Sequence, residues 1–184
     1  DKNIYSYTGK ERVFGAAVTG AEGAVDPSAD ENSITYTFYR DNSGVKGEEL
    51  SGQPTEVGTY RVVATYAGDD NYEGNNSTAL SFTISASTLN VDISGYSDEY
   101  DGSTHDVARV SSVTGVGGAE VAYEITYAKK EGAYADSAPE AGNTDAWKPA
   151  RDLQVTDVAD SGGYWYKVEV TGEEKDNYAP LIDS

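Results

Sequence analysis

Two stretches of this chain share one pattern, and that pattern decides the fold. Residues 58–66 read GTYRVVATY and are followed by DDNY at residues 69–72. Residues 163–170 read GYWYKVEV and are followed by KDNY at residues 175–178. Apolar and polar residues alternate in both stretches, which is typical of a β-strand that buries one face.

Two further landmarks repeat upstream of these strands in the same order. Tyr7-Thr8-Gly9 corresponds to Tyr100-Asp101-Gly102, and residues 34–39 (ITYTFY) correspond to residues 121–127 (VAYEITY). Three landmarks in one order indicate an internal repeat.

The boundary between the repeats is expected near Ser85-Ala86-Ser87. These small residues separate the alternating pattern of residues 79–84 from that of residues 88–93. The sequence therefore predicts two domains, residues 1–86 and residues 87–184. The first repeat is expected to lack most of its opening strand, and the second most of its closing strand.

Short strand patterns recur throughout each repeat between clusters of Gly, Asp, Asn and Ser, and no long helical pattern is present. About seven short strands in roughly 90 residues is the rhythm of an immunoglobulin-like sandwich. We therefore expect an all-β chain of two tandem immunoglobulin-like antiparallel β-sandwich domains. A β-barrel is the alternative architecture.

The composition excludes several classes of function. Asp and Glu number 32 against 13 Lys and Arg, a formal net charge of −19, which repels nucleic acid and anionic lipid. The 15 Tyr, 3 Phe and 2 Trp supply core-forming side chains, so the chain is expected to fold. It has no Cys, which removes disulfides and thiol chemistry. No apolar run is long enough to cross a membrane.

The second repeat carries motifs of a known family. Residues 100–107 (YDGSTHDV), residues 122–127, the Trp147 hairpin at residues 145–148 and Asp176-Asn177-Tyr178 together resemble bacterial immunoglobulin-like surface repeats. In the first repeat Thr8 replaces the Asp of the turn, and no Trp matches Trp147.

The resemblance implies a non-enzymatic stalk or spacer in a large bacterial cell-surface or secreted protein, an adhesin, and hence an extracellular location. The expected partners are neighbouring repeats of the same chain and a host protein or glycan. Nucleic acid and membrane insertion are not expected, and the chain is expected to be a monomer without a cofactor.

Catalysis has little support in the sequence. His105 is the only imidazole, and its neighbour Asp106 should point to the opposite face of a strand. We therefore expect a structural histidine. An enzyme would need a deep pocket that gathers His105 with carboxylates, which nothing in the sequence predicts.

One metal site is conceivable. Hard cations such as calcium bind several carboxylate oxygens from loops. In an immunoglobulin-like unit the loop holding Glu173, Glu174 and Asp176 would lie near the linker at residues 85–88. These residues are the candidate ligands of an interdomain calcium ion, and a solvated acidic loop is the alternative.

The competing hypothesis is a binding module that contacts a glycan or host protein through exposed aromatic side chains. Sugars stack on exposed rings. Trp147, on its hairpin, is the candidate ligand-binding residue, and Trp165 is a second aromatic to examine for exposure.

Overall fold

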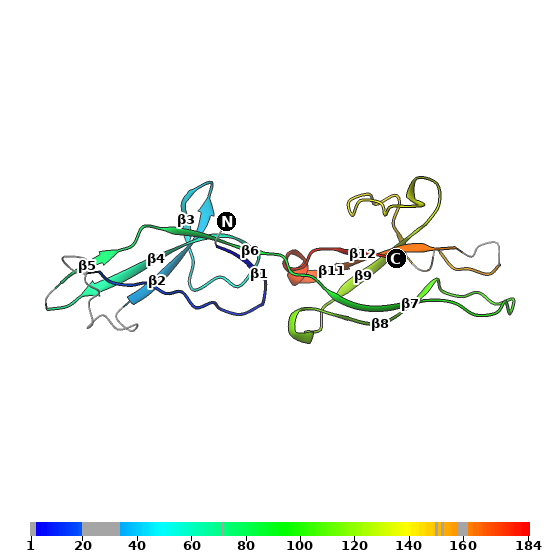
Figure 1. The fold of residues 1–184 in the computed structure, drawn as a ribbon, viewed down its shortest axis with the longest axis horizontal. Helices are drawn as coiled ribbons and strands as arrows, with labels where there is room; N and C mark the ends of the chain where they lie inside the picture. The colour runs from blue at the N-terminus through cyan, green and yellow to red at the C-terminus, as the bar shows by residue number, and fades with distance from the viewer. Residues whose placement is uncertain (1–2, 20–33, 71, 150, 152, 158–161) are drawn as a thin grey trace. The chain divides into compact units, whose positions relative to one another are not determined.

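The computed structural model describes residues 3–19, 34–70, 72–149, 151, 153–157 and 162–184 (Figure 1). Its regular structure is mostly β-strand in several sheets, which confirms the expected all-β class. The chain forms two compact units, Asp1–Ser85 (unit 1) and Ala86–Ser184 (unit 2). The division falls one residue before the position expected from the sequence.

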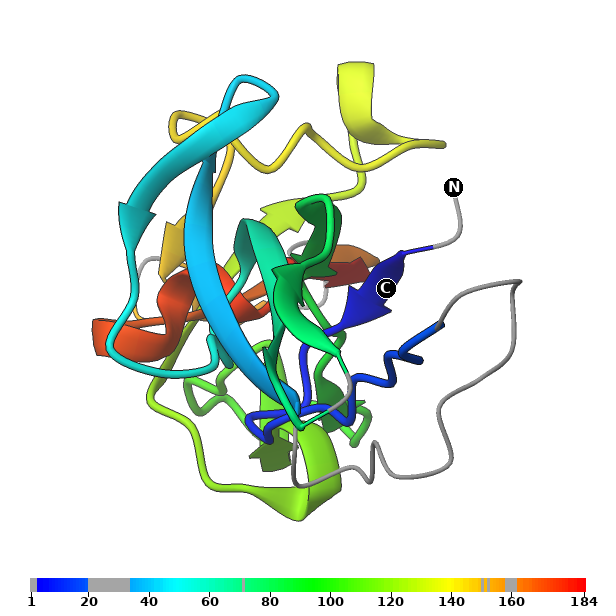
Figure 2. The same cartoon turned by 90° about the vertical axis from the view of Figure 1, so that its left-hand side faces the viewer.

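Unit 1 is built on one sheet with strand order β1-β6-β4-β2-β3, with β5 paired to β4. The β1–β6 pair is parallel, and the other pairs are antiparallel. Figure 2 shows the β2–β3 hairpin in blue and cyan with the twist typical of such ribbons. The strands are β1 (Ile4–Ser6), β2 (Ile34–Asn42), β3 (Val45–Glu49), β4 (Gly58–Gly68), β5 (Glu73–Asn76) and β6 (Leu80–Ser85).

Aromatic side chains fill the core of unit 1. Tyr60 on β4 and Phe82 on β6 are 1% and 2% exposed. The ring of Phe14, in the segment before β2, packs on Phe82 and Phe38, with its centroid 5.1 Å from that of Phe82 and 5.5 Å from that of Phe38. Tyr60, Val62 and Tyr66 are buried on one face of β4, as alternation predicts, and Val63 on the other face is buried as well.

Unit 2 contains a two-stranded sheet, β7-β8, and a four-stranded sheet with order β10-β9-β11-β12, all antiparallel. Short 3₁₀ turns occur at Val116–Gly118, Gly132–Tyr134 and Gly172–Asn177. The strands are β7 (Asn90–Gly95), β8 (Ala108–Thr114), β9 (Tyr123–Lys129), β10 (Lys148–Pro149), β11 (Tyr164–Val170) and β12 (Leu181–Asp183).

The two sheets of unit 2 form separate layers, drawn one below the other in Figure 1. Val113 on β8 is buried, as are Tyr127 on β9 and Val168 on β11. Each sheet therefore contributes apolar side chains to the interior, as in a sandwich-like packing.

Both ends of the chain contribute strands of three residues, β1 and β12.

Candidate functional site

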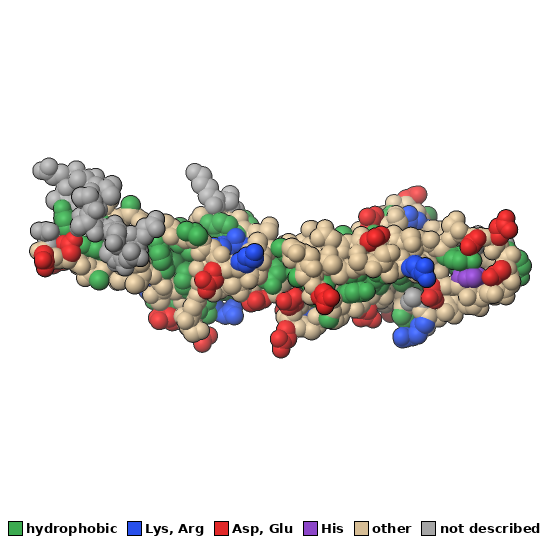
Figure 3. All heavy atoms as spheres, turned by 90° about the horizontal axis from the view of Figure 1, so that it is seen from below, with side chains coloured by type: hydrophobic (Ala, Val, Ile, Leu, Met, Phe, Trp, Pro, Cys, Tyr) green, Lys and Arg blue, Asp and Glu red, His purple; other side chains and the backbone are tan. Residues whose placement is uncertain are grey.

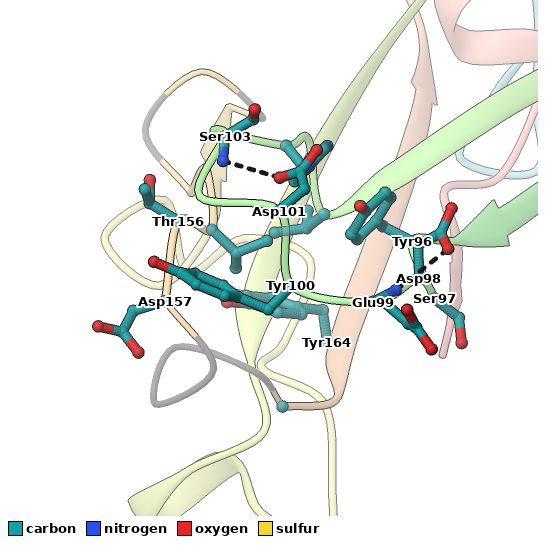
Figure 4. A pocket seen from close by; sticks show the side chains of 14 residues that line it. Tyr96, Ser97, Asp98, Glu99, Tyr100, Asp101, Ser103, Thr156, Asp157 and Tyr164 are labelled. Carbon is teal, nitrogen blue, oxygen red and sulfur yellow. Dashed lines mark hydrogen bonds and ion pairs between the residues drawn. The ribbon is translucent and has the colours of Figure 1, made fainter.

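A pocket of about 310 Å³ opens on unit 2 between the loop that follows β7 and the beginning of β11 (Figure 4). Residues 96–101 form one wall, and Tyr164 and residues 155–157 form the others. His105, the only imidazole of the chain, also borders a second hollow on the other side of the loop, together with Asp98 and Asp106.

Backbone hydrogen bonds hold both sides of the loop that follows β7. The Tyr96 amide donates to the Val107 carbonyl over 3.2 Å, and His105 and Val155 exchange two bonds of 2.9 Å. Inside the loop the Ser103 amide donates to the Asp101 carboxylate over 2.7 Å, and Gly102 has a φ of +74°. The Tyr-Asp-Gly motif is thus a turn that Asp101 closes and that glycine makes possible.

His105 is held by the same turn. Its Nε2 lies 2.9 Å from Oδ1 of Asp101, and its ring stacks on Tyr96 with centroids 4.1 Å apart and planes 13° from parallel. The hydrogen bond from His105 is the main cause that lowers the pKa of Asp101, and the Ser103 amide lowers it further. Burial raises the pKa of Tyr96, and the charges of Asp101 and Asp98 raise it further.

Nothing in the sequence predicted that carboxylates and His105 would meet at one pocket. The structure brings Asp98, Glu99 and Asp101 to the same pocket as His105. Asp106, the neighbour considered from the sequence, instead accepts a hydrogen bond from Gln154 over 3.2 Å. The sequence feature that points to this contact is Asp101, which lies four residues before His105 on the other side of the Gly102 turn.

Unit 1 repeats this arrangement with different side chains. The Arg12 guanidinium lies 4.7 Å from the centroid of the Tyr5 ring, as His105 lies over Tyr96. The Arg12 carbonyl accepts a bond from the Gln53 side chain, whereas the His105 carbonyl accepts one from the Val155 backbone amide. Gly9, with a φ of +66°, precedes Arg12 at the spacing of Gly102 from His105. Arg12 and His105 thus occupy matching positions after the glycine turn, although the tyrosines that they cover are not at matching positions before it.

The pocket wall is aromatic as well as acidic. Tyr100 is 68% exposed and Tyr96 40% exposed, and Tyr164 lines the same cavity. Tyr96 and Tyr100 are the exposed rings of the pocket, and neither was a candidate ligand-binding residue from the sequence.

Trp147 does not have the exposure that ligand binding requires. It is 5% exposed, and its Nε1 donates to the Glu140 carbonyl over 3.0 Å. The loop before it folds back and covers the ring, whose face lies 5.5 Å from Nζ of Lys167. This corrects the sequence-based expectation, because strand alternation does not predict burial inside an irregular loop.

Trp165 is also engaged within unit 2. Its Nε1 donates to the Tyr134 carbonyl over 2.8 Å, and Nζ of Lys130 lies 4.2 Å from its ring centroid.

The candidate calcium ligands lie where the topology predicts. Glu173, Glu174 and Asp176 belong to the 3₁₀ turn Gly172–Asn177 and are exposed. The Ser87 amide donates to the Asn177 carbonyl over 2.9 Å, which places the turn beside the start of unit 2. Among the described residues, however, no group of three or more His, Cys, Asp or Glu side chains converges on a point where a metal could bind.

Acidic side chains spread over the visible face of both units (Figure 3). Within the described parts of the chain, no helix is both long and apolar enough to cross a membrane. No family model matches the chain, and no curated protein or solved structure shows significant similarity to it.

Proposed function

We propose that the chain is a pair of tandem immunoglobulin-like β-sandwich repeats that serve as a non-enzymatic spacer. The repeats would belong to a large bacterial cell-surface or secreted protein, an adhesin, and would act outside the cell. Neighbouring repeats of the same chain are its proposed partners.

One observation carries this proposal: Arg12 in unit 1 stands where His105 stands in unit 2. Both side chains cover a tyrosine ring and follow a glycine turn at the same spacing. Arginine stays protonated and cannot act as a general base at neutral pH. The role that both side chains can fill is packing against a tyrosine ring. We therefore assign His105 a structural role rather than a catalytic one.

The net charge of the chain also supports the proposed spacer function. A net charge of −19 keeps a protein soluble and repels other acidic surfaces. A spacer benefits from both properties.

Stretching single molecules tests the mechanical role. Two sandwich units should give two separate unfolding events, each releasing about 30 nm of chain, since an extended residue spans at most about 3.6 Å. One event for the whole chain, or extension without any resisting event, would contradict a spacer of two repeats.

A second candidate function has one observation in its favour. Tyr96 and Tyr100 are exposed at the pocket of unit 2, and such rings can stack on a sugar. A binding module for a glycan or host protein predicts binding on a ligand array that is lost in Tyr100→Ala.

A further inference from the structure

The two glycine turns differ in the charge of the segment that precedes them. In unit 1 the guanidinium of Arg12 lies on this segment, 4.7 Å from the centroid of the Tyr5 ring, and donates a hydrogen bond to the Ser6 carbonyl. Tyr5 and Ser6 lie four and three residues before Gly9. Unit 1 therefore supplies its own cation to the segment before its turn.

Unit 2 has carboxylates at the matching places. The residues four and three positions before Gly102 are Asp98 and Glu99, and both are exposed. His105, which stands at the arginine position after the turn, directs its Nε2 to Asp101 over 2.9 Å. Where unit 1 places a guanidinium, unit 2 thus presents two carboxylates.

The tyrosine of the turn also differs between the units. Each turn carries a tyrosine two residues before its glycine: Tyr7 of unit 1 is 6% exposed, whereas Tyr100 of unit 2 is 68% exposed. Tyr100 lines the pocket together with Tyr96 and Tyr164 (Figure 4). The face of a tyrosine ring attracts cations, and a planar guanidinium can stack on it. Unit 2 therefore offers open rings beside its carboxylates.

The pocket is strongly negative. Carboxylates line it from the loop and from the opposite wall, namely Asp98, Glu99, Asp101 and Asp157, and none of its described lining residues is a Lys or an Arg. Burial raises the pKa of Tyr96, and the charges of Asp101 and Asp98 raise it further, so an added negative charge is disfavoured there. A volume of about 310 Å³ lies at the lower end of the range for ligand sites, which suits one side chain.

We infer that this pocket binds the guanidinium group of an arginine side chain on a partner protein. The rings of Tyr96 and Tyr100 supply faces on which the guanidinium can stack. A carboxylate such as that of Glu99 can accept two parallel hydrogen bonds from a guanidinium. An anionic partner would be repelled by the same carboxylates.

Arginine binding goes beyond the spacer function and does not depend on it. Two unfolding events under force would support a spacer whether or not the pocket binds arginine. The proposed ligand also differs from a glycan, because it is a cation and its affinity must fall as salt screens the carboxylates.

Titration of the isotope-labelled full chain with blocked peptides tests the site. Acetyl-Gly-Arg-Gly-amide should shift the amide resonances of residues 96–103 and of Tyr164 in a saturable manner, and raising the salt from about 0.02 M to about 0.5 M should weaken its binding. The matching lysine peptide should bind more weakly, because an ammonium is more strongly hydrated and does not stack. The matching glutamine peptide, which is neutral, should not bind.

Two pairs of variants separate the rings from the charges. Tyr100→Ala should weaken binding of the arginine peptide by about two- to fivefold, and Glu99→Gln should weaken it by about two- to fivefold as well. Tyr123→Ala and Asp92→Asn are the matched controls. Both replace exposed side chains of unit 2 that lie outside the pocket, so the affinity should not change.

An arginine peptide that binds no more tightly than the lysine or glutamine peptide would overturn the inference. Equal affinities in Glu99→Gln and Asp92→Asn, or in Tyr100→Ala and Tyr123→Ala, would also overturn it. Neutral oligosaccharides that shift the same amides while the arginine peptide does not would assign the pocket to a glycan instead.

Discussion

Single side chains in unit 2 combine packing with hydrogen bonding in an irregular loop. Trp147 donates to the Glu140 carbonyl, and the buried Lys167 donates to the neighbouring Ala141 carbonyl over 3.0 Å. Nζ of Lys167 also lies 2.6 Å from the Glu169 carboxylate. These contacts fasten the loop before β10 onto the four-stranded sheet.

Truncation of Trp147 should destabilise unit 2 strongly. The indole is 5% exposed, and removal of a buried Trp side chain costs about 3–5 kcal/mol. Denaturant unfolding of Trp147→Ala, followed by Trp165 emission, measures the loss. Tyr100→Ala is the control: this ring is 68% exposed, and its removal should change the unfolding free energy by less than about 0.5 kcal/mol. Equal losses in the two variants would refute the buried position of Trp147.

The His105 position should accept arginine. Since Arg12 fills the equivalent position in unit 1, His105→Arg should leave the stability of unit 2 within about 0.5 kcal/mol of the original. His105→Ala removes the ring stacked on Tyr96 and should cost about 0.5–1.5 kcal/mol. Thermal unfolding monitored by tryptophan emission separates the two variants. An arginine variant less stable than the alanine variant would show that the positions are not equivalent.

At the scale of elements, Asp41 connects three strands of unit 1. It ends β2, lies 2.7 Å from Nε of Arg61 on β4, and accepts a 3.4 Å hydrogen bond from Ser81 on β6. The Gly44 amide in the β2–β3 turn donates to its other oxygen over 2.8 Å. This hydrogen bond is the main cause that lowers the pKa of Asp41, and Arg61 and Ser81 contribute in the same direction against desolvation.

The lowered pKa of Asp41 predicts a loss of stability in acid. The folded chain binds this proton less readily than the unfolded chain, in which the pKa is near 3.9. The contribution is therefore present above that pH and is lost as the pH falls through the folded pKa. Thermal unfolding of Asp41→Asn, followed by circular dichroism from about pH 5 to about pH 2, should show a shallower fall than the original chain. Parallel curves would contradict the prediction.

The strands were predictable and the pocket was not, for physical reasons. Alternation is a local property, so β4 and β11 follow from residues 58–66 and 163–170. The pocket depends on how the loop at residues 96–101 meets residues 155–157 and Tyr164, which lie far from it in sequence, and local patterns carry little information about such contacts. The burial of Trp147 likewise depends on how an irregular loop folds back.

The whole molecule carries 32 acidic residues and only 13 basic ones. Each of its two units has its own interior of aromatic or apolar side chains. Like charges destabilise a compact state through repulsion, so the packing of each unit must offset that cost. Two such units, each with its own core, make up the chain.

Gly115 offers a way to perturb one unit alone. An added Cβ at this residue would overlap the hydroxyl group of buried Tyr178, which accepts a hydrogen bond from the Val116 amide. Overpacking of this kind costs about 1–3 kcal/mol. Gly95→Ala is the matched control, because a Cβ there meets open space.

Hydrogen exchange of the full chain in increasing denaturant, compared between the original sequence and Gly115→Ala, shows directly whether the two units unfold separately. We predict that the amides of residues 86–184 open at lower denaturant in Gly115→Ala while those of residues 1–85 keep their midpoint. A single midpoint for the whole chain that moves as one in the variant would contradict two units with separate cores.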